Sequence, residues 1–320
     1  MINVGIVGVG HLGEIHLKLI LSSKYFNLVG FYETDKKRSS HISNEYNVLC
    51  YDNLLTLTDL VDAVVISTPT YFHYEIAKFF LEKKIHVFIE KPITTNIKQA
   101  NELISIKNKF KLVGQVGHVE RFNGAFLEVE KLLNPMFIES HRLSSYSSRG
   151  TDVSVVLDLM IHDIDIVLSI VDSKVVNLSA NGTKIISNSP DIANARIEFE
   201  NGCVANLTAS RLSLKKMRKM RIFQSDSYIS IDFDKSKSEI VNILDYDKKN
   251  KYAMTIHNND GVEKEIKIKT YDNLQVNAIV KEHQDFARSI IENKKPKVSF
   301  ETGRNALELA FKILDEINKK

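Results

Sequence analysis

The pattern of apolar and polar positions changes once along the chain, near residue 118. Before that point, short apolar runs alternate with segments whose apolar residues recur at helical spacing. The strand-like runs are INVGIVGVG, NLVGFYE, VDAVVISTP, HVFIE and KLVGQVG, and the helical segments are 12–22, 36–46, 76–84 and 96–109. This alternation predicts an α/β Rossmann domain with a doubly wound parallel sheet, whose strand ends share one ligand-binding edge.

The segment after Gly117 is predicted to form a second, α+β domain. Residues 123–133 and 155–171 have helical spacing, and a final helix is predicted at about 304–317. Between them apolar and polar residues alternate, as in ARIEFENGCVANLTAS and EIVNIL, and Asn201-Gly202 marks a hairpin turn. We therefore expect a cofactor-binding domain over 1–118 and a substrate-binding and oligomerisation domain over 119–320, built on a large mixed or antiparallel open sheet.

Composition narrows the class of protein. The chain has 320 residues, 43% hydrophobic and 26% charged, which is typical of a globular protein. A formal charge of +3 argues against a nucleic-acid-binding protein. The two cysteines are far apart in sequence, which fits a reducing compartment and no structural zinc. The apolar N-terminal run lacks the basic flank of a signal peptide, and no apolar run is long enough to span a bilayer. We expect a cytoplasmic protein with no membrane partner.

A glycine-rich motif follows the first predicted strand and opens the first predicted helix. It reads Gly8-Val9-Gly10-His11-Leu12-Gly13 and fits G-x-G-x-x-G. Gly8 permits the tight turn, Gly10 lets the backbone approach a pyrophosphate, and Gly13 lets the helix pack closely on the sheet. The pyrophosphate would face the helix N-terminus. The motif predicts a dinucleotide cofactor, bound by these glycines with His11 and Leu12.

Glu33 bears on which dinucleotide is bound. It ends the second predicted strand about twenty residues after Gly13, where a carboxylate usually binds the adenosine ribose 2′-hydroxyl. A carboxylate repels a 2′-phosphate, which favours NAD over NADP. Lys36, Lys37 and Arg38 follow directly and leave NADP open as the alternative.

Three further segments resemble one family. They are DAVVISTPTYFHYEIAKFFLEKKIHVFIEKP, which ends in Glu90-Lys91-Pro92, the Asp158-Leu-Met-Ile-His162 spacing, and the C-terminal PKVSFETGRNALELAFKIL. With the glycine motif, they resemble the Gfo/Idh/MocA oxidoreductase family along essentially the whole chain. One difference is that relatives often have glycines before the D-x-x-x-H segment, where this chain has Asp152-Val-Ser-Val-Val-Leu157.

The resemblance implies an N-terminal Rossmann domain and a C-terminal α/β domain whose open sheet often mediates dimer or tetramer contacts. We therefore expect a homodimer or homotetramer. The resemblance also implies an active-site set of polar residues and a second set near the nicotinamide and its ribose. By motif position the first set is Lys91, Asp158 and His162, and the second is Thr68, Pro69 and Glu90. We also count Lys91 and His73 as cofactor-binding, His73 because it follows Pro69 at a strand end, with packing against the helix as its open alternative.

The residue types suit alcohol oxidation. Asp158 and His162 are four residues apart and would share one face of a helix, where Asp158 can orient the imidazole. His162 is predicted to be the general base in oxidation and the general acid in reduction. The Lys91 ammonium can stabilise developing alkoxide character. A metal site at Asp158, His162, Asp163 and Asp165 is an alternative without a convincing ligand set on one face, so we expect no metal.

Substrate candidates lie in two segments. Gly117-His-Val-Glu-Arg121-Phe-Asn123 follows the fifth predicted strand, and Arg149-Gly-Thr-Asp152 precedes the predicted catalytic helix. These segments resemble a branch of the family, the UDP-N-acetylglucosamine 3-dehydrogenases. Arg121 and Arg149 can bind a diphosphate through bidentate contacts, and we count Asn123 with them as substrate-binding. Ion pairing at the surface or between the domains is the open alternative for the two arginines.

The leading hypothesis is therefore an NAD(P)-dependent oxidoreductase that acts on an alcohol of a sugar or sugar nucleotide. Two alternatives use the same scaffold. One is an NAD-dependent glycoside-cleaving enzyme that regenerates its cofactor, and the other is a non-catalytic regulator that senses a dinucleotide. Net formation of NADH separates the first hypothesis from both alternatives.

Overall fold

The computed structural model describes residues 1–146, 153–246, 253–257, 260–272 and 276–319. Its contacts divide into two compact units, Met1–Val119 with Asn277–Glu308, and Glu120–Val276 with Leu309–Lys320. Residues 277–308, which the predicted boundaries assign to the second domain, thus pack with the first unit. That each unit is an independent domain stays a prediction.

The first unit is built on a five-stranded parallel sheet with the order β2-β1-β3-β4-β5. The strands are β1 Ile2–Val7, β2 Phe26–Tyr32, β3 Ala63–Ile66, β4 His86–Glu90 and β5 Gly114–Gly117. The three central strands have almost wholly buried side chains, as expected for a parallel sheet covered on both faces. Strand order reverses between β1 and β3, and this switch point is where such sheets bind ligands. The predicted Rossmann-type sheet is confirmed.

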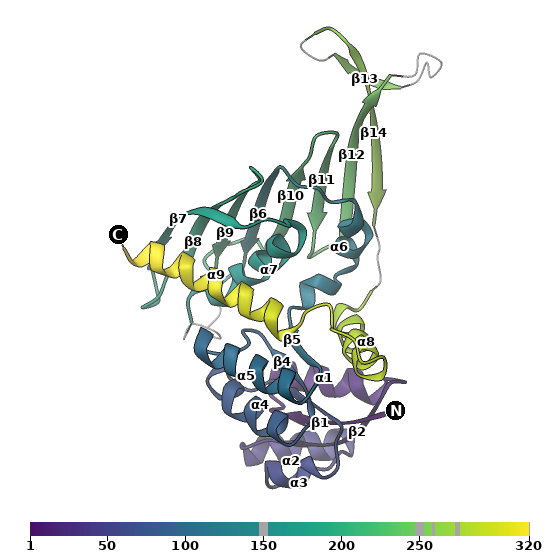
Figure 1. Cartoon of the computed structure of the whole chain (residues 1–320), viewed down its shortest axis with the longest axis vertical. Coiled ribbons are helices and arrows are strands. Elements are labelled where there is room, and N and C mark those ends of the chain that lie inside the picture. The colour runs from purple at the N-terminus through teal and green to yellow at the C-terminus, as the bar shows by residue number, and fades with distance from the viewer. Residues whose placement is uncertain (147–152, 247–252, 258–259, 273–275, 320) are drawn as a thin grey trace. The chain divides into compact units, whose positions relative to one another are not determined.

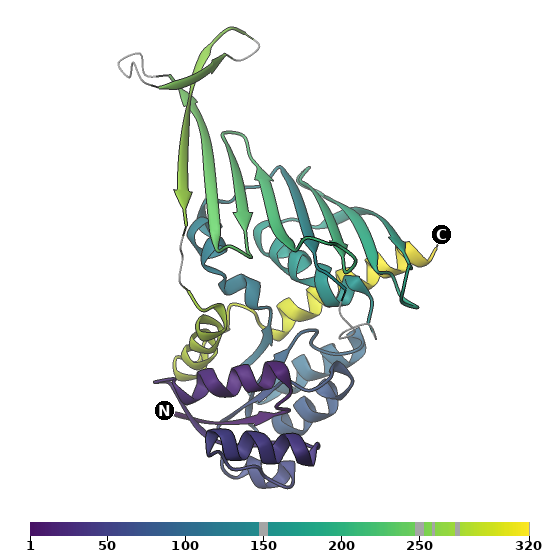
Figure 2. The same cartoon turned by 180° about the vertical axis from the view of Figure 1, so that it is seen from behind.

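Helices cover both faces of this sheet. They are α1 His11–Leu21, α2 Lys36–Tyr46, α3 Leu54–Thr58, α4 His73–Glu82, α5 Ile97–Lys109 and α8 Ala278–Ile291, with a 3₁₀ turn at Thr70–Phe72. Opposite views show α4 and α5 on one face and α1 on the other (Figures 1 and 2). The Asp35 and Asn96 side chains cap α2 and α5, which sets where these helices begin. Helices α3 and α8 were not among the predicted elements.

The second unit is built on a nine-stranded sheet with the order β13-β14-β12-β11-β10-β6-β9-β8-β7. The strands are β6 Phe137–Leu143, β7 Val175–Thr183, β8 Ile192–Phe199, β9 Val204–Ser210, β10 Met217–Phe223, β11 Ser227–Asp232, β12 Lys237–Asp245, β13 Met254–His257 and β14 Glu263–Tyr271. Among the strands that the structure describes in this sheet, only β6 and β9 pair in parallel, so the predicted large mixed sheet is confirmed. Along β8 exposed and buried residues alternate, because helices cover one face.

Helices of the second unit lie on the covered face (Figure 1). They are α6 Gly124–Val129, α7 Ile161–Ile170 and the last part of α9 Phe300–Asn318, with 3₁₀ turns at Val119–Phe122 and Glu130–Leu132 and a π-helical turn at Val156–Met160. The predicted helix over 155–171 thus starts as a π-turn and continues as α7. The predicted helix over 123–133 is α6 followed by a 3₁₀ turn.

Candidate functional site

The glycine turn between β1 and α1 has three different local environments. Gly8 has φ +84°, a backbone conformation that side chains disfavour, and a Cβ there would lie 2.9 Å from Thr68 Cγ2. A Cβ at Gly13 would lie 2.1 Å from the Gly8 carbonyl oxygen and 2.5 Å from Ser67 Oγ. A Cβ at Gly10 would meet nothing within 4 Å. Gly8 and Gly13 therefore close the turn against the protein, whereas Gly10 faces open space.

A cavity of about 490 Å³ opens at the switch point beside this turn. Its lining residues come from the ends of the first three strands and the segments after them: Val7, Gly8, Gly10, Tyr32, Glu33, Thr34, Leu54, Ser67, Thr68, Pro69, Phe72 and Ile76. Thr68 Oγ1 is buried there and has no hydrogen-bond partner among the described residues. No side chain caps α1, so its first N–H groups remain available to an anion. These features fit a dinucleotide with its pyrophosphate against Gly10, His11 and Leu12.

Glu33 lies at the cavity and is tied to the turn. Its Oε2 accepts the Val9 N–H at 2.9 Å, and its Oε1 accepts the Asp35 N–H at 3.0 Å. Arg38 contacts the turn: its Nε donates to the Val9 carbonyl oxygen at 2.7 Å, and its guanidinium pairs with Glu14. The local charge presented to an adenosine ribose is therefore the Glu33 carboxylate, because Arg38 is already paired.

His73 is buried behind the cavity. Its Nε2 lies 2.9 Å from the Thr68 carbonyl oxygen and its Nδ1 lies 2.9 Å from the Pro92 carbonyl oxygen. Burial lowers the pKa of His73, although the two carbonyl groups oppose this shift. The side chain thus joins the turn after β3 to the turn after β4. Both ring nitrogens face the protein, so a direct cofactor contact by His73 stays a prediction.

Glu90 and Lys91 stand at the end of β4, on the same sheet edge as the cavity. Glu90 is 8% exposed, and its Oε2 accepts the Lys91 N–H at 3.2 Å. Its carboxylate fills the space beside Gly117, where a Cβ would lie 2.7 Å from Glu90 Cδ. Lys91 is half-buried. The sheet therefore brings Glu90 and Lys91 to the edge that carries Gly8 and Thr68, as the sequence pattern predicts.

Asp158 and His162 lie in the second unit. Asp158 is in the π-turn and His162 is in the first turn of α7, and both are half-buried. The segment that joins them is therefore not the unbroken α-helix that the sequence predicts. A π-turn holds slightly more residues than an α-turn, so side chains four apart still lie on one face. Their predicted proximity is thus compatible with the turn observed, while their catalytic roles stay predictions.

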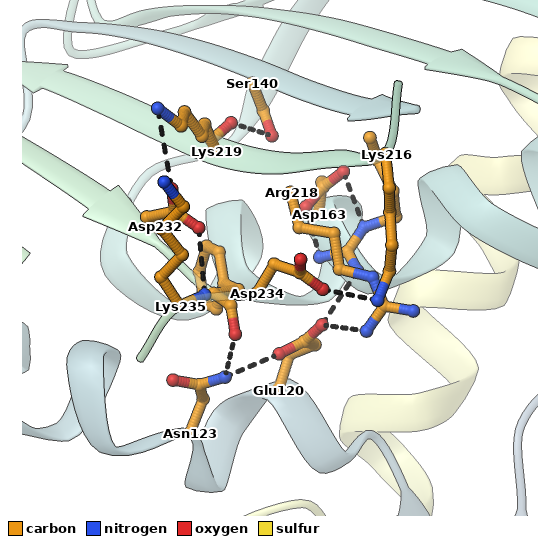
Figure 3. Close-up of polar contacts among 12 residues, drawn as sticks. Glu120, Asn123, Ser140, Asp163, Lys216, Arg218, Lys219, Asp232, Asp234 and Lys235 are labelled. Carbon is orange, nitrogen blue, oxygen red and sulfur yellow. Dashed lines mark hydrogen bonds and ion pairs between the residues drawn. The ribbon is translucent and has the colours of Figure 1, made fainter. Parts of the chain in front are cut away.

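A buried ionic cluster holds α7 on the sheet, and sequence reasoning did not find it. Arg142 on β6 donates from Nη1 to Glu120 Oε1 at 2.8 Å, and from Nη2 and Nε to the two oxygens of Asp163 at 2.9 and 3.1 Å. Burial opposes the charge, but Asp163 and Glu120 raise the pKa of Arg142 above its ordinary value. Arg218 adds a second cation 3.5 Å from Glu120 (Figure 3). Because Asp163 directly follows His162, the cluster fixes the helix turn that carries the predicted base.

The predicted substrate residues differ in their surroundings. Arg121 is 7% exposed and its Nη1 lies 3.6 Å from Asp165 Oδ2. Arg121 Nε and both Asp165 carboxylate oxygens have no hydrogen-bond partner among the described residues. Arg121 therefore keeps donor capacity in the second unit. Arg149 lies outside the described residues.

Asn123 is bonded within the protein. Its Oδ1 accepts the Ala125 N–H at 3.1 Å and caps α6, and its Nδ2 donates to Glu120 Oε2 at 3.1 Å and to the Phe233 carbonyl oxygen at 3.0 Å. Both amide hydrogens are thus used. These contacts favour a structural role, and its substrate contact stays a prediction.

Asn123→Ala is accordingly expected to lower the free energy of unfolding by about 1 kcal/mol through loss of the helix cap. The KM for the substrate should stay within about twofold, since no amide hydrogen of Asn123 is left for a ligand. Thermal unfolding and steady-state kinetics measure the two effects. A large rise in KM with little change in melting temperature would instead make Asn123 a substrate residue.

The helices in the described part of the chain include none whose length and apolar character suit a membrane span. Nor do the described residues contain a group of three or more His, Cys, Asp or Glu side chains placed to hold a metal ion. Asp163 and Asp165, considered above as metal ligands, face Arg142 and Arg121 instead.

The chain matches known proteins over most of its length. Residues 2–118 match an oxidoreductase family with an NAD-binding Rossmann fold, and residues 113–230 match the GFO/IDH/MocA C-terminal domain. The chain is 30% identical to UDP-N-acetylglucosamine 3-dehydrogenase of Acidithiobacillus ferrooxidans over 311 residues, 97% of this chain and 95% of that one. It is 25% identical to scyllo-inositol 2-dehydrogenase (NAD(+)) of Bacillus subtilis, over 66% of this chain and 68% of that one.

A solved structure of the Acidithiobacillus ferrooxidans UDP-N-acetylglucosamine 3-dehydrogenase has a fold similar to that of this chain. It aligns with a TM-score of 0.89 at 28% sequence identity and covers 99% of this chain and 98% of that chain. Both units of this chain therefore have counterparts in one solved relative.

Proposed function

The chain belongs to the Gfo/Idh/MocA family of NAD-binding oxidoreductases, and from this premise we propose that it oxidises the 3-hydroxyl of UDP-N-acetylglucosamine with NAD⁺. The family relationship makes it a dehydrogenase that acts on CH–OH groups. The observation that carries the choice of substrate is the match to a UDP-N-acetylglucosamine 3-dehydrogenase over 97% of the chain.

The residues of the first unit fit the cofactor. Gly8, Gly10 and Gly13 with the N-terminus of α1 would hold the pyrophosphate, and Glu33 would accept hydrogen bonds from the adenosine ribose. The buried hydroxyl of Thr68, which lines the cavity beside Pro69, would form a hydrogen bond with the cofactor. When bound, the nicotinamide accepts the hydride. The protein supplies the position of the ring and the charges around it.

Three residues would act on the alcohol. His162 takes the hydroxyl proton as the carbon loses hydride, and Asp158 orients the imidazole so that its basic nitrogen faces the hydroxyl. Lys91 donates a hydrogen bond to the substrate oxygen and stabilises negative charge as the proton leaves. The Arg142 cluster supports this chemistry indirectly, because it holds Asp163 and hence the α7 turn next to His162.

A diphosphate group suits the cations of the second unit. Arg121 keeps an Nε–H without a hydrogen-bond partner among the described residues, and a buried guanidinium binds phosphate oxygens with defined geometry. We propose Arg121, with Arg149, as the diphosphate-binding pair. An inositol, the substrate type named for another relative, has no diphosphate and would leave these arginines without a ligand.

The test is NADH formation from NAD⁺ with a panel of alcohols: UDP-N-acetylglucosamine, UDP-glucose, free N-acetylglucosamine and myo-inositol. We expect NADH with UDP-N-acetylglucosamine and a sugar-nucleotide product lighter by one H₂ in mass spectrometry. NADH from inositol alone would overturn the substrate assignment. Sugar release without net NADH would indicate glycoside cleavage, and cofactor binding without turnover of any compound would indicate a regulator.

Cofactor choice gives a second measurable expectation. We propose that the Glu33 carboxylate makes NAD⁺ bind at least about tenfold more tightly than NADP⁺, through repulsion of the 2′-phosphate. Glu33→Ser should narrow this ratio, because NADP⁺ binding strengthens when the repulsion is removed and NAD⁺ binding weakens when the ribose loses its carboxylate acceptor. Calorimetric titration of both cofactors measures it, with Asp35→Ser as the control that removes a neighbouring carboxylate. Equal affinity of the wild type for both cofactors would contradict the proposal.

A further inference from the structure

A row of three buried ionisable side chains crosses the first unit. His16 on α1 is fully buried, and its Nε2 lies 2.8 Å from Glu90 Oε1. The other nitrogen of the same ring, Nδ1, lies 2.7 Å from Nε2 of His283 on α8. His283 is 3% exposed. Both bonds have ordinary hydrogen-bond lengths, so the three groups form one continuous chain.

Aromatic rings enclose this row. The Phe88 ring is 5.5 Å from the His16 ring and 6.2 Å from the His283 ring, and Phe26 lies 6.2 Å from His283. These phenylalanines are at most 2% exposed and offer no hydrogen-bonding group. On the side that these phenylalanines cover, the histidine rings therefore have no polar neighbour that could hold a water molecule.

The two ends of the row reach different places. At one end Glu90 Oε2 accepts the Lys91 N–H, on the sheet edge that carries the glycine turn and the cofactor cavity. At the other end His283 lines a surface pocket of about 240 Å³ together with Leu19, Ser22, Ser23, Lys24, Tyr25, Val280 and Gln284. A buried chain of three exchangeable groups thus runs from the cofactor edge to a pocket on another side of the unit.

We propose that Glu90, His16 and His283 form a proton relay between the cofactor edge of the sheet and the pocket between α1 and α8. The proposal rests on the dehydrogenase function above, because oxidation of an alcohol releases one proton for each hydride transferred and reduction consumes one. The three relay residues would take up or release a proton at the cofactor edge beside Lys91. They do not act on the substrate alcohol themselves, so they are not catalytic residues.

The relay has two arrangements that differ by one proton. In the first, Glu90 is a carboxylate, each histidine carries its proton on Nε2, and Nδ1 of His283 is free of a proton. A proton that arrives at this Nδ1 from the pocket shifts each hydrogen along the chain. The second arrangement then has a proton on Glu90 and one on Nδ1 of each histidine. The reverse shift releases a proton to the pocket, and neither histidine needs a net charge at either end point.

The environment of His283 supports a neutral relay. Burial first, and then the neighbouring His16, lower the pKa of His283 well below its ordinary value. A histidine that stays neutral near pH 7 keeps one nitrogen as a donor and one as an acceptor, which a relay requires. A permanently charged ring would have two donors and no acceptor.

The first test is His283→Gln in the full chain. The glutamine amide can still donate a hydrogen bond to His16 Nδ1, but it does not pass a proton on. We expect kcat for NADH formation to fall on the order of tenfold, with a larger solvent deuterium isotope effect and an unchanged Kd for NAD⁺. Imidazole should restore kcat in His283→Ala by occupying the pocket. Gln284→Ala, at the same pocket, is the control and should behave as the wild type.

A wild-type kcat and isotope effect in His283→Gln would overturn the relay, since a structural role alone is preserved by this substitution. The second test needs no substrate: NMR of isotope-labelled histidine in the full chain. We expect neutral His283 and His16, each protonated on Nε2, at neutral pH. A His16 ring protonated on both nitrogens wherever the chain is folded would be a fixed ion pair with Glu90 and would overturn the proposal. If the wild type forms no NADH with UDP-N-acetylglucosamine, the proposed function fails and this NMR result alone decides the relay.

Discussion

Replacing Lys91 with methionine is expected to lower kcat for alcohol oxidation by about 10²–10³-fold, because the developing alkoxide loses its cationic hydrogen-bond donor. Methionine keeps the length and much of the apolar stem of lysine, so the half-buried side chain is replaced without a large cavity. The Lys91 N–H that Glu90 accepts belongs to the main chain and survives the substitution. The Kd for NAD⁺ should therefore change by less than about threefold.

Stopped-flow NADH formation and calorimetric NAD⁺ titration separate these two effects. Lys98→Met is the matched control, because Lys98 is an exposed lysine on α5 in the same unit and its loss should leave both quantities unchanged. His162→Ala is expected to lower kcat by a similar factor, and the double variant should lose much less than the product of the two single losses, since both residues act in one step. A Lys91→Met enzyme with kcat near wild type would remove Lys91 from the proposed mechanism.

The cofactor half of the site could be predicted from the sequence because its signals are local. A G-x-G-x-x-G motif, the strand before it and the helix after it lie within about twenty residues. The positive φ of Gly8 and the close approach of Gly13 to the Gly8 carbonyl oxygen are also local to the turn. Alternation of apolar runs with helical spacing also predicts the order of the strands up to β5 and of the helices between them except α3.

Other features could not be predicted because they depend on contacts between distant segments. Arg142 is one arginine among many in sequence, and only the pairing of β6 with α7 brings it to Asp163. His16 and His283 are separated by 267 positions and meet only because α8 packs beside α1. Helix α8 itself carries a readable signal, since Asn277 caps it and Phe286, Ala287 and Ile290 recur at helical spacing. The charged residues within α8 and the strand-like alternation of the segment before it make that signal hard to recognise in the sequence.

Two glycine substitutions should separate folding from cofactor binding. Gly13→Ala places a methyl group 2.1 Å from the Gly8 carbonyl oxygen, so α1 or the turn must move. We expect the free energy of unfolding to fall by about 1–3 kcal/mol and NAD⁺ affinity to be lost with the turn geometry. Gly10→Ala meets no protein atom within 4 Å, and its φ of −59° suits alanine. Its melting temperature without cofactor should therefore match the wild type.

The methyl group of Gly10→Ala would instead occupy the cavity side of the turn, where the main chain must approach a pyrophosphate. NAD⁺ affinity should fall at least about tenfold, and the rise in melting temperature that NAD⁺ gives the wild type should disappear at the same ligand concentration. Thermal unfolding of the wild type, Gly10→Ala and Gly13→Ala measures the melting temperature of each protein and its rise on addition of NAD⁺. If Gly10→Ala bound NAD⁺ as tightly as the wild type, the cofactor would not lie against this turn, and the assignment of the cavity between β1 and β3 would fail with it. The pair is decisive because both substitutions add the same methyl group within one turn, and only the surroundings that the fold gives each glycine differ.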